Sequence, residues 1–498
     1  MLAFERHGDE NRMSNNLPEH SEKSSGIDTS YLPARPRGYE DIKALAKLCG
    51  CNIPDLIVLA RNNDPFFCGT LAHRRDAEWF VWCWNKLGYT GRTGVHLRAI
   101  HYRLVSQDPP PVMPDGSPYL NTLECWSYLG CASKTARHLR MVDVEAFEDH
   151  RNPRPLIYAD PLEETDPALV ANHWFEWALP EIRADLSDDF FLSLPRFTAT
   201  GYGYDPALQP YLLEIWIEKS TMNSVLLPVC RKYNINLVTS IGFQSIPSAI
   251  ALLRRAEIHG KPARVFYISD FDPAGSFMPD AVARQIEFWG VVLGIDADVK
   301  LHPLALTSEQ VTRYELPSIP IKESDRRKAG FESRYGMEAT ELDALEALRP
   351  GELARLVENA VLPYRDQELQ RRWLDAEEEA NRIATDAAEW VARDVRDEWQ
   401  AIQSEVCAIL ESYRERIVAL NTDLQQELNP YRPRIEVVRQ AIQDRIDEVE
   451  EVFELPEQPE PDLPEPDEAD WLFDSGRDYL TQLAFYKARR ASTFEAHP

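Results

Sequence analysis

The sequence predicts an α/β protein in which a parallel β-sheet with crossover helices lies between a helical N-terminal domain and a C-terminal helical arm. Three short runs rich in Ile, Val, Phe and Tyr predict strands at residues 212–217, 235–239 and 264–268. Between them, segments 221–233 and 245–258 have the spacing of amphipathic helices. Strands that alternate with helices at this interval are typical of a parallel sheet.

The region before the sheet is predicted to be helical, after a polar stretch at residues 1–37 that predicts a disordered arm. Residues 75–87 carry more apolar surface than one helix exposes to water, so we expect this segment to be buried. Its large aromatic side chains are Trp79, Phe80, Trp82 and Trp84. Two more helices are expected at residues 39–48 and 53–60.

Residues 95–106 and 122–142 predict two further helices in this region. In the first, an apolar stripe is formed by Leu97, Ile100, His101 and Leu104. At about 100° per residue, Tyr102 projects away from that stripe. A compact helical module with a basic last helix suits a winged-helix DNA-binding domain, although a solvated helix face explains the same charges equally well. The candidate DNA-binding residues here are Arg98, Lys134, Arg137 and Arg140.

Acidic residues stand at the ends of two predicted strands. Glu218 follows the first strand, and Asp270 and Asp272 follow the third. The carboxyl ends of parallel strands meet at one edge of the sheet, so three carboxylates would repel one another there unless a cation lies between them. Oxygen ligands without His or Cys suit Mg²⁺ or Mn²⁺. The alternative is an ordinary doubly wound domain in which these acids only cap helices.

Together these motifs resemble a Toprim domain, which topoisomerases, bacterial primases and several nucleases share. Glu218-Lys219 follows the first strand, residues 242–245 read Gly-Phe-Gln-Ser, and residues 270–275 read Asp-Phe-Asp-Pro-Ala-Gly. Within that group the pattern is most similar to the A subunit of topoisomerase VI and its meiotic double-strand-break relatives. The resemblance implies that Glu218, Asp270 and Asp272 are catalytic metal ligands, and Lys219 joins the residues expected at DNA.

The order of the modules extends the resemblance. Proteins like the topoisomerase VI A subunit place a winged-helix domain with a nucleophilic tyrosine before the Toprim domain. Residues 98–102, Arg-Ala-Ile-His-Tyr, resemble that motif and place Tyr102 at the nucleophile position. The resemblance implies a 5′-phosphotyrosyl intermediate and a homodimer in which different subunits supply the tyrosine and the metal. Attack by metal-activated water is the alternative, and it is the one we favour.

The chain contains no Walker-type Gly-x-x-x-x-Gly-Lys-Ser/Thr loop. Because topoisomerase VI needs a separate ATPase subunit to move strands, we expect a Mg²⁺-dependent nuclease that cuts DNA without strand passage. One alternative is a tyrosine transesterase that works through Tyr102 with a separate ATPase subunit. Another is a non-enzymatic winged-helix DNA-binding protein whose acidic cluster is structural.

The remaining chain is predicted to connect the domains and to form an arm. Residues 156–209 are expected to join the two domains, with a helix at 168–179 and a hairpin around 190–204. Beyond the sheet, apolar residues at three- and four-residue steps in 367–428 predict one long or two packed helices. Pro430 and Pro433 interrupt this pattern before a second helix to about Phe453, which predicts a helical hairpin or coiled-coil dimerisation arm.

The last part of the chain alternates Pro with acids, and residues 446–476 contain no Lys or Arg. This composition predicts a solvated, extended linker, followed by a terminal docking helix at 471–490. The predicted division is a disordered arm at 1–37, a helical winged-helix-like domain at 38–155, a connecting segment at 156–209, a Toprim domain at 210–350, a helical arm at 351–453, an acidic linker at 454–470, and a terminal helix and tail at 471–498.

Composition limits the class of protein further. The formal net charge of −28 argues against a protein that coats DNA but leaves room for a local basic groove, because screening makes nearby charges decisive. The sequence has no apolar stretch that would span a bilayer, and its eight cysteines suggest reduced thiols and a cytoplasmic location. Cys49, Cys51, Cys68 and Cys83 lack usual zinc spacing and are expected to be buried thiols.

Overall fold

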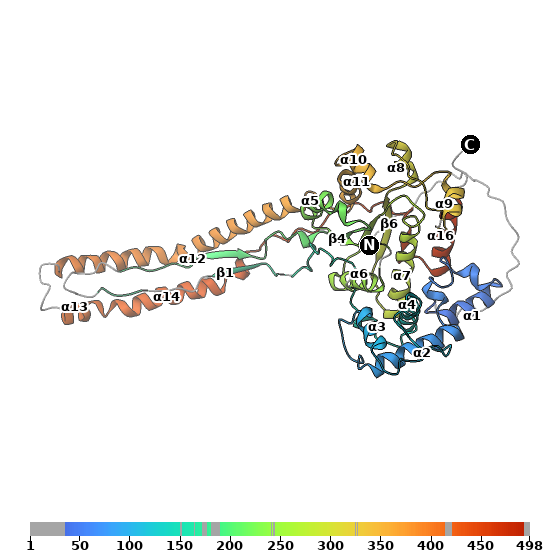
Figure 1. Cartoon of the computed structure of the whole chain (residues 1–498). Helices are drawn as coiled ribbons and strands as arrows, with labels where there is room; N and C mark the ends of the chain where they lie inside the picture. Colours follow the sequence, from blue (N-terminus) through green and yellow to red (C-terminus); the bar gives the residue numbers. More distant parts are fainter. Residues whose placement is uncertain are drawn as a thin grey trace, which may run out of the picture.

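The structure is a computed structural model that describes residues 35–149, 152–163, 165–171, 177–180, 190–240, 242, 245–323, 325, 327–413 and 421–492. The predicted disordered arm therefore lies outside the described residues, apart from 35–37. A globular body carries the sheet, and a long helical arm extends from it (Figure 1). No helix among the residues described is both long and apolar enough to cross a membrane.

Five strands form the central sheet in the order β4-β3-β5-β6-β7. Their bounds are β3 (Leu212–Ile217), β4 (Asn236–Thr239), β5 (Ala263–Ile268), β6 (Val299–Ala305) and β7 (Phe473–Asp474). The first four in this order are parallel, and β7 is antiparallel to β6. The three strands predicted first are confirmed, and so is the parallel arrangement. The two-residue strand β7 was not predicted.

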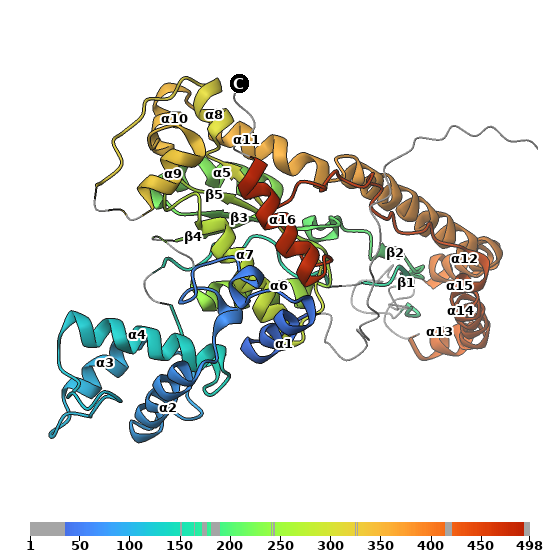
Figure 2. The same cartoon turned by 90° about the vertical axis from the view of Figure 1, so that its right-hand side faces the viewer.

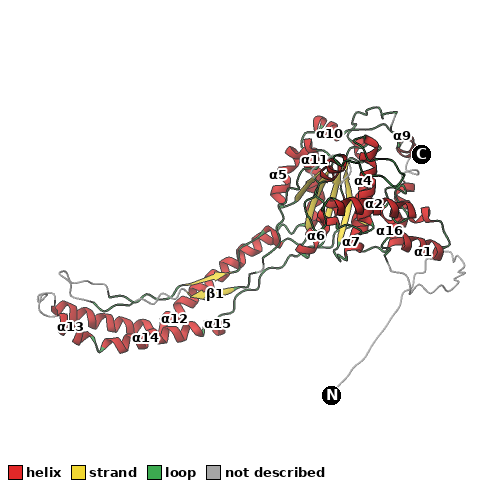
Figure 3. Ribbon diagram, turned by 60° about the horizontal axis from the view of Figure 1, so that its bottom comes forward, coloured by secondary structure: helices red, strands yellow, loops and turns green. Residues whose placement is uncertain are grey.

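Helices cover both faces of the sheet, which explains why β3 and β5 are buried along their whole length (Figure 3). One face packs against α6 (Ile246–His259), α7 (Met278–Leu293) and α16 (Tyr479–Ser492). The other packs against α5 (Asn223–Tyr233) and α11 (Glu352–Val361). Around the carboxyl ends of the strands lie α8 (Ser308–Arg313), α9 (Lys328–Tyr335) and α10 (Leu342–Leu348).

The N-terminal domain is helical and has its own aromatic core. It consists of α1 (Tyr39–Cys49), α2 (Leu71–Lys86), α3 (Leu97–Val105) and α4 (Leu123–His138). The short 3-10 turns of this domain are Ile53–Leu56, Pro65–Phe67 and Val144–Ala146. Outside the domain, further 3-10 turns lie at Pro206–Leu208, Ser220–Met222 and Leu362–Tyr364. Between residues 35 and 149, β-pairing is limited to the isolated bridges Val95↔Phe147 and Val112↔Pro118.

Three predictions in this domain are wrong. The helix expected at 53–60 is reduced to the 3-10 turn Ile53–Leu56, which begins beside Pro54. Trp82 is 48% exposed, because α2 has one solvent face on which the Lys86 ammonium lies 4.8 Å from the indole ring. Cys49 is exposed at the end of α1, whereas Cys68 and Cys83 are buried as expected.

A buried ion cluster joins the N-terminal domain to the sheet domain. The fully buried Arg284 of α7 contacts Asp64 at 3.2 Å and Glu287 at 2.6 Å. The same guanidinium donates to the hydroxyl of Tyr479 in α16 at 2.9 Å. Three distant parts of the sequence therefore meet around one charge, and removing Arg284 would leave two buried carboxylates without their cation.

The arm is the predicted helical hairpin, but its reversal lies elsewhere. It contains α12 (Leu369–Tyr413), α13 (Asn421–Leu428), α14 (Tyr431–Asp447) and α15 (Val449–Val452). Buried residues of α12 pack against those of both α13 and α14, so these two helices run back along α12. Pro430 and Pro433 do not form the turn. They stand at the start of α14, where a missing amide hydrogen removes no helical hydrogen bond.

The middle of the segment expected to connect the two domains lies along the arm (Figure 1), whereas its start lies at the sheet, where Leu156 bridges Leu237 of β4. β1 (Ala168–Ala171) and β2 (Phe197–Thr200) form an antiparallel pair, and Trp177 bridges Leu192 farther out. The helix expected at 168–179 is therefore wrong for residues 168–171, and the hairpin around 190–204 has its partner strand much earlier in the chain. Residues 172–176 and 181–189 lie outside the described residues.

The acidic linker at 454–470 is extended, as predicted, but it is bound rather than freely solvated. The Trp373 indole donates to the Pro459 carbonyl at 3.1 Å, and the Asp462 amide donates to Asp366 at 2.8 Å. Glu468 forms ion pairs with Arg264 and Lys300 at the sheet. The expected helix at 471–490 begins only at Tyr479, because residues 473–474 pair with β6.

Candidate functional site

The pairing of β3 with β5 brings the predicted carboxylates to one edge of the sheet. Ile217 is in register with Ile268, and the Glu218 amide donates to the Ile268 carbonyl at 3.2 Å. Glu218 therefore leaves its strand beside the start of the turn that carries Asp270 and Asp272. Both strands are parallel, so their carboxyl ends lie on the same side.

The turn after β5 holds Asp272 in a defined position. Its Oδ1 accepts hydrogen bonds from the amides of Ala274 at 2.8 Å and Gly275 at 2.5 Å. The Ser269 hydroxyl donates to the Gly275 carbonyl at 3.1 Å and closes the turn. A Cβ at Gly275 would lie 2.1 Å from the Asp270 carbonyl oxygen, so this close approach requires glycine.

The three carboxylates lie near enough to affect one another's charge. The pKa of Glu218 is raised to about 7, chiefly by burial and also by the negative charges of Asp270 and Asp272, while Lys219 lowers it. Burial also raises the pKa of Asp270, although the Leu342 amide and Lys219 stabilise its ionised form. The Leu342 amide donates to Asp270 Oδ1 at 2.7 Å.

Lys219 stands inside this acidic cluster, not on an open surface. Its Nζ is 3.0 Å from Asp270 Oδ2, 2.8 Å from Asp343 Oδ2 and 3.7 Å from Glu341 Oε2. Asp343 and Glu341 lie at the start of α10. The ammonium is thus the positive charge that balances Asp270 in this arrangement, which is a different environment from the DNA contact predicted for it.

The donor set fits a hard divalent cation in kind, because all its members are carboxylates. Among the residues described, however, no three His, Cys, Asp or Glu side chains stand close enough to hold an ion in the present arrangement. Glu218, Asp270 and Asp272 are the residues that would bind it. Phe243 and Gln244, which belong to the predicted motif, lie outside the described residues.

Tyr102 is not part of this cluster. It projects from α3 with 59% of its surface exposed, as the helical spacing predicted. His101 beside it is buried, with Nδ1 2.7 Å from the Tyr119 hydroxyl and Nε2 3.2 Å from Asn121 Oδ1. In two perpendicular views α3 lies at one end of the body and α8–α10 at the other (Figures 1 and 2), so a single chain does not bring Tyr102 to the carboxylates.

The predicted DNA-binding residues of the N-terminal domain do not form a uniform basic face. Arg98 and Arg140 are exposed. Lys134 is half-buried and donates to the Asn62 carbonyl at 2.7 Å. Arg137 lies 4.8 Å from the Phe147 ring, and burial lowers the pKa of its guanidinium to about 10. Arg137 therefore packs against the domain's own core.

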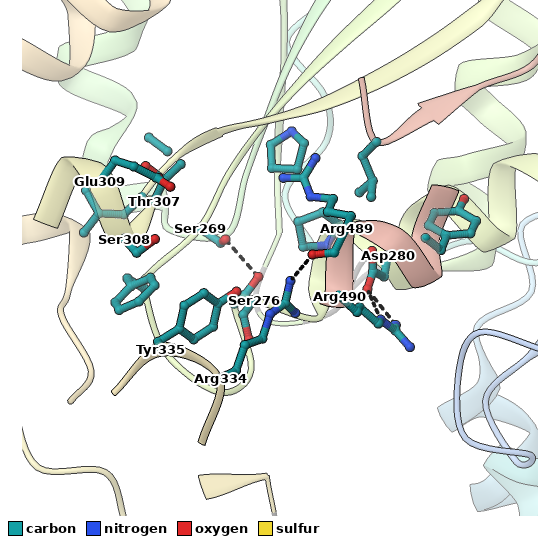
Figure 4. Close-up of a pocket in the computed structure, with 18 of the residues that line it drawn as sticks. Ser269, Ser276, Asp280, Thr307, Ser308, Glu309, Arg334, Tyr335, Arg489 and Arg490 are labelled. Atoms are coloured by element: carbon teal, nitrogen blue, oxygen red, sulfur yellow. Dashed lines mark hydrogen bonds and ion pairs between the residues drawn. The ribbon is translucent and has the colours of Figure 1, made fainter. Parts of the chain in front are cut away.

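A cavity of about 570 Å³, which the sequence did not predict, adjoins the carboxylate edge. The turn after β5 forms one wall through Asp270 and Gly275, and α9 and α16 form others. Figure 4 shows Arg334 and Arg489 in this cavity, with Arg490 bonded to Asp280 beside them. The pair of arginines at 489–490 is visible in the sequence, but nothing local indicates that the terminal helix returns to the sheet.

Neither a protein-family model nor a curated protein matches this chain.

Proposed function

We propose that this chain is a Mg²⁺-dependent enzyme that cleaves phosphodiester bonds in DNA, with Glu218, Asp270 and Asp272 as its metal-binding residues. The observation that carries the proposal is that Glu218, Asp270 and Asp272 follow two paired parallel strands at the same end of the sheet. Mg²⁺, or Mn²⁺ in its place, would stabilise negative charge on the phosphate and promote ionisation of water. Clustered acids with raised pKa values are characteristic of functional sites.

The protein's own groups suit this chemistry. A Glu218 carboxyl with a pKa of about 7 can accept a proton near neutral pH, which is the property of a general base. The Asp272 carboxylate is oriented by two backbone amides, so its position does not depend on a bound ligand. Glu218 would act either as this base or as a ligand of the cation, because a bound cation keeps the carboxylate ionised, and Asp272 would position the cation.

DNA as the substrate follows from the resemblance to the topoisomerase VI A subunit and from the helical domain that precedes the sheet. Arg98 and Arg140 are the exposed members of the predicted DNA-binding set. Because the whole chain carries a net charge of −28, DNA would bind locally at such exposed arginines. Its affinity would fall steeply as the salt concentration rises. A homodimer in the cytoplasm is part of the same proposal, and the eight free thiols agree with a reducing compartment.

A second candidate is a tyrosine transesterase, which the exposure of Tyr102 beside Arg98 favours. Because α3 lies away from the carboxylates within one chain, this mechanism requires the tyrosine of a partner subunit. Strand passage would in addition require a separate ATPase subunit.

The test is incubation of the purified chain with supercoiled plasmid in the presence of Mg²⁺, Mn²⁺ or EDTA. We expect nicking or linearisation only with the divalent cation, and a fall of about 10²–10⁴-fold for Asp272→Asn. Asp296→Asn is the matched control, because Asp296 is an exposed carboxylate just before β6, at the opposite edge of the sheet. Equal cleavage by both variants would contradict the proposed site, and protein covalently bound to 5′ ends would identify the tyrosine mechanism.

A further inference from the structure

We propose that Tyr267 is a positioning residue of the carboxylate site, whose hydroxyl holds the Glu218 carboxylate in place when that carboxylate binds a cation. Tyr267 belongs to β5 and stands three positions before Asp270. This role rests on the function proposed above, since it adds a residue to the same site. Two features of the molecule support it: a buried donor without an acceptor, and a carboxylate without a donor.

The Tyr267 hydroxyl is the buried donor. The side chain is fully buried, and its hydroxyl has no hydrogen-bond partner among the residues that the structure describes. A hydroxyl that leaves water without gaining a partner destabilises the fold, so most buried tyrosine hydroxyls bond to an acceptor. An unpaired hydroxyl next to a candidate site therefore calls for a functional explanation.

The Glu218 carboxylate is the acceptor, and it differs from the other two acids of the site. Two amides of the turn orient Asp272, and the Leu342 amide orients Asp270. No donor among the described residues bonds to the Glu218 carboxylate, whose pKa is shifted by burial and by nearby charges. Carboxylates that bind metal ions are normally oriented by hydrogen bonds of this kind. Glu218 is the member of the set that has none.

The register of the sheet directs Tyr267 and Glu218 to the same face. Trp216 pairs with Tyr267, and both belong to the core between the sheet and helices α6 and α7. Ile217 pairs with Ile268, and these two belong to the core on the other face. The Glu218 amide continues the ladder to the Ile268 carbonyl, so the Glu218 side chain alternates back to the face that carries Tyr267.

The charge of Glu218 acts on the Tyr267 hydroxyl. Burial raises the pKa of Tyr267, and the negative charge of Glu218 adds to that increase. The phenol therefore keeps its proton at physiological pH and can donate it to an oxygen. Glu214, a buried carboxylate within β3, is already committed to other donors, because it accepts from Arg255 at 2.6 Å and from Trp216 at 2.8 Å. A carboxylate has two oxygens, so Glu218 can bind a cation through one and accept from Tyr267 with the other.

Calorimetric titration of the full chain with Mn²⁺ tests the role by comparing the wild type with Tyr267→Phe. The substitution removes only the hydroxyl and keeps the ring in the core. We expect Mn²⁺ to bind about ten-fold more weakly, as when the hydrogen-bond partner of a metal ligand is removed. The melting temperature without divalent cations should be unchanged or higher, because the hydroxyl that is lost has no partner.

Tyr486→Phe is the matched control. Tyr486 is a buried tyrosine of α16, and its hydroxyl also has no partner among the described residues. Burial raises its pKa, and the charged groups that influence it most are Glu287 and Arg284, not the carboxylates of the site. Removing this hydroxyl should leave Mn²⁺ affinity unchanged.

A double-mutant cycle with Glu218→Ala identifies the partner of the hydroxyl. If Tyr267 acts through Glu218, adding Tyr267→Phe to Glu218→Ala should weaken Mn²⁺ binding no further. Additive losses would show that the hydroxyl acts on another group and would overturn the assignment.

The failure of this role and the failure of the proposed function give different results. Weaker Mn²⁺ binding by Tyr267→Phe but not by Tyr486→Phe supports the positioning role. Equal Mn²⁺ affinity of the wild type and Tyr267→Phe overturns that role and leaves the proposed function intact. A lower melting temperature of Tyr267→Phe without divalent cations, at unchanged Mn²⁺ affinity, assigns the hydroxyl to the fold alone. Absence of Mn²⁺ binding by the wild type overturns both.

Discussion

The carboxylate edge of the sheet and the surface around Tyr102 differ in how far the chain itself organises them. Around the carboxylates, strand register, two amides of the turn and the Leu342 amide all orient acidic side chains. Tyr102 has 59% of its surface exposed on a nine-residue helix, and only its helix fixes its direction. The first region is held in place by contacts within one chain. The second would need groups from a partner to take part in the proposed cleavage.

A sequence motif can acquire a function in two ways: its own backbone can hold the side chains in place, or a partner can use an exposed side chain. A cluster preorganised by its own backbone should lose activity when that backbone is disturbed. An exposed side chain should tolerate substitution unless an incoming partner uses it.

The largest effect is expected from Gly275→Ala. A Cβ at this position would lie 2.1 Å from the Asp270 carbonyl oxygen and 3.3 Å from Asp272 Oδ1. The turn must therefore shift, and both carboxylates shift with it. We expect cation-dependent cleavage to fall by about 10²–10³-fold and the free energy of unfolding to fall by about 2–4 kcal/mol, measured by plasmid cleavage and by denaturant titration.

Gly290→Ala provides the control for that substitution. Gly290 is inside α7, and the nearest atom to its added Cβ, Leu253 Cδ2, is 3.8 Å away. Alanine favours a helix more than glycine does, so stability should be unchanged or rise by up to about 1 kcal/mol. Equal losses in the two variants would show that the turn has no special geometric role.

A second large effect is expected when the internal cation is removed by Lys219→Met. The ammonium now balances Asp270 and Asp343 at 3.0 and 2.8 Å. Without it the acids repel one another, so we expect Mn²⁺ to bind about ten-fold more tightly and to raise the melting temperature more than in the wild type. Calorimetry with Mn²⁺ alone measures the affinity.

Lys232→Met is the matched variant. Lys232 is on α5, away from the cluster, and forms an exposed ion pair with Glu358 of α11 at 2.7 Å. It should leave Mn²⁺ affinity unchanged. Weaker Mn²⁺ binding by Lys219→Met would indicate that the lysine supports the site instead of competing with the cation.

A smaller effect concerns the pH dependence of stability. The folded chain raises the pKa of Glu218 from 4.5 to about 7, so between these values the folded state binds more protons than the unfolded state. The protonated carboxyl therefore stabilises the fold below pH 4.5, and this stabilisation is lost as pH rises through about 7. After a discount for partial solvent exposure, the contribution is on the order of 2 kcal/mol.

Glu218→Gln cannot ionise, so its unfolding free energy should fall less between pH 5 and 8 than that of the wild type. Denaturant titrations without divalent cations at several pH values measure the two slopes. Parallel slopes would mean that neither burial nor the charges of Asp270 and Asp272 raise the pKa of Glu218.

Most of the sheet could be predicted from the sequence because its signals are local. The apolar runs that form β3 and β5 and the helical spacing of α5 and α6 are contained in segments of 6 to 14 residues. Strand β7 could not be predicted, because it contains two residues and exists only through pairing with β6. A hairpin was expected around residues 190–204, but its partner strand β1 and its position along the arm were missed, because Phe190 packs on Trp399, more than two hundred residues later.

The candidate site also has parts that could be predicted from the sequence and parts that could not. Glu218, Asp270 and Asp272 could be assigned to one edge because they end adjacent parallel strands. The hydrogen bond to Asp270 and the ion pairs to Lys219 come from the segment at 341–343, far along the chain from both strands. The cavity depends on the return of α16 to the sheet, a long-range contact that local periodicity does not encode.

The smallest effect is expected from Tyr102→Phe, which decides between the two mechanisms. The side chain is largely exposed, so loss of one hydroxyl should change the free energy of unfolding by less than about 0.5 kcal/mol. If water attacks the phosphate, cleavage should stay within about three-fold of the wild type, because the proposed proton acceptor and metal ligands are intact.

If Tyr102 is the nucleophile, cleavage should instead disappear as completely as in Asp272→Asn, since no other group can form the phosphotyrosyl bond. Tyr128→Phe is a suitable control, because that hydroxyl is bonded to Asp76 at 3.0 Å and is not available for attack. We expect retained cleavage and no protein attached to the DNA ends. Mixing Tyr102→Phe with Asp272→Asn completes the test: if a dimer combines one subunit's tyrosine with the other's carboxylates, two inactive variants would restore cleavage in mixed dimers. Under water attack, the mixture should show only the activity contributed by Tyr102→Phe.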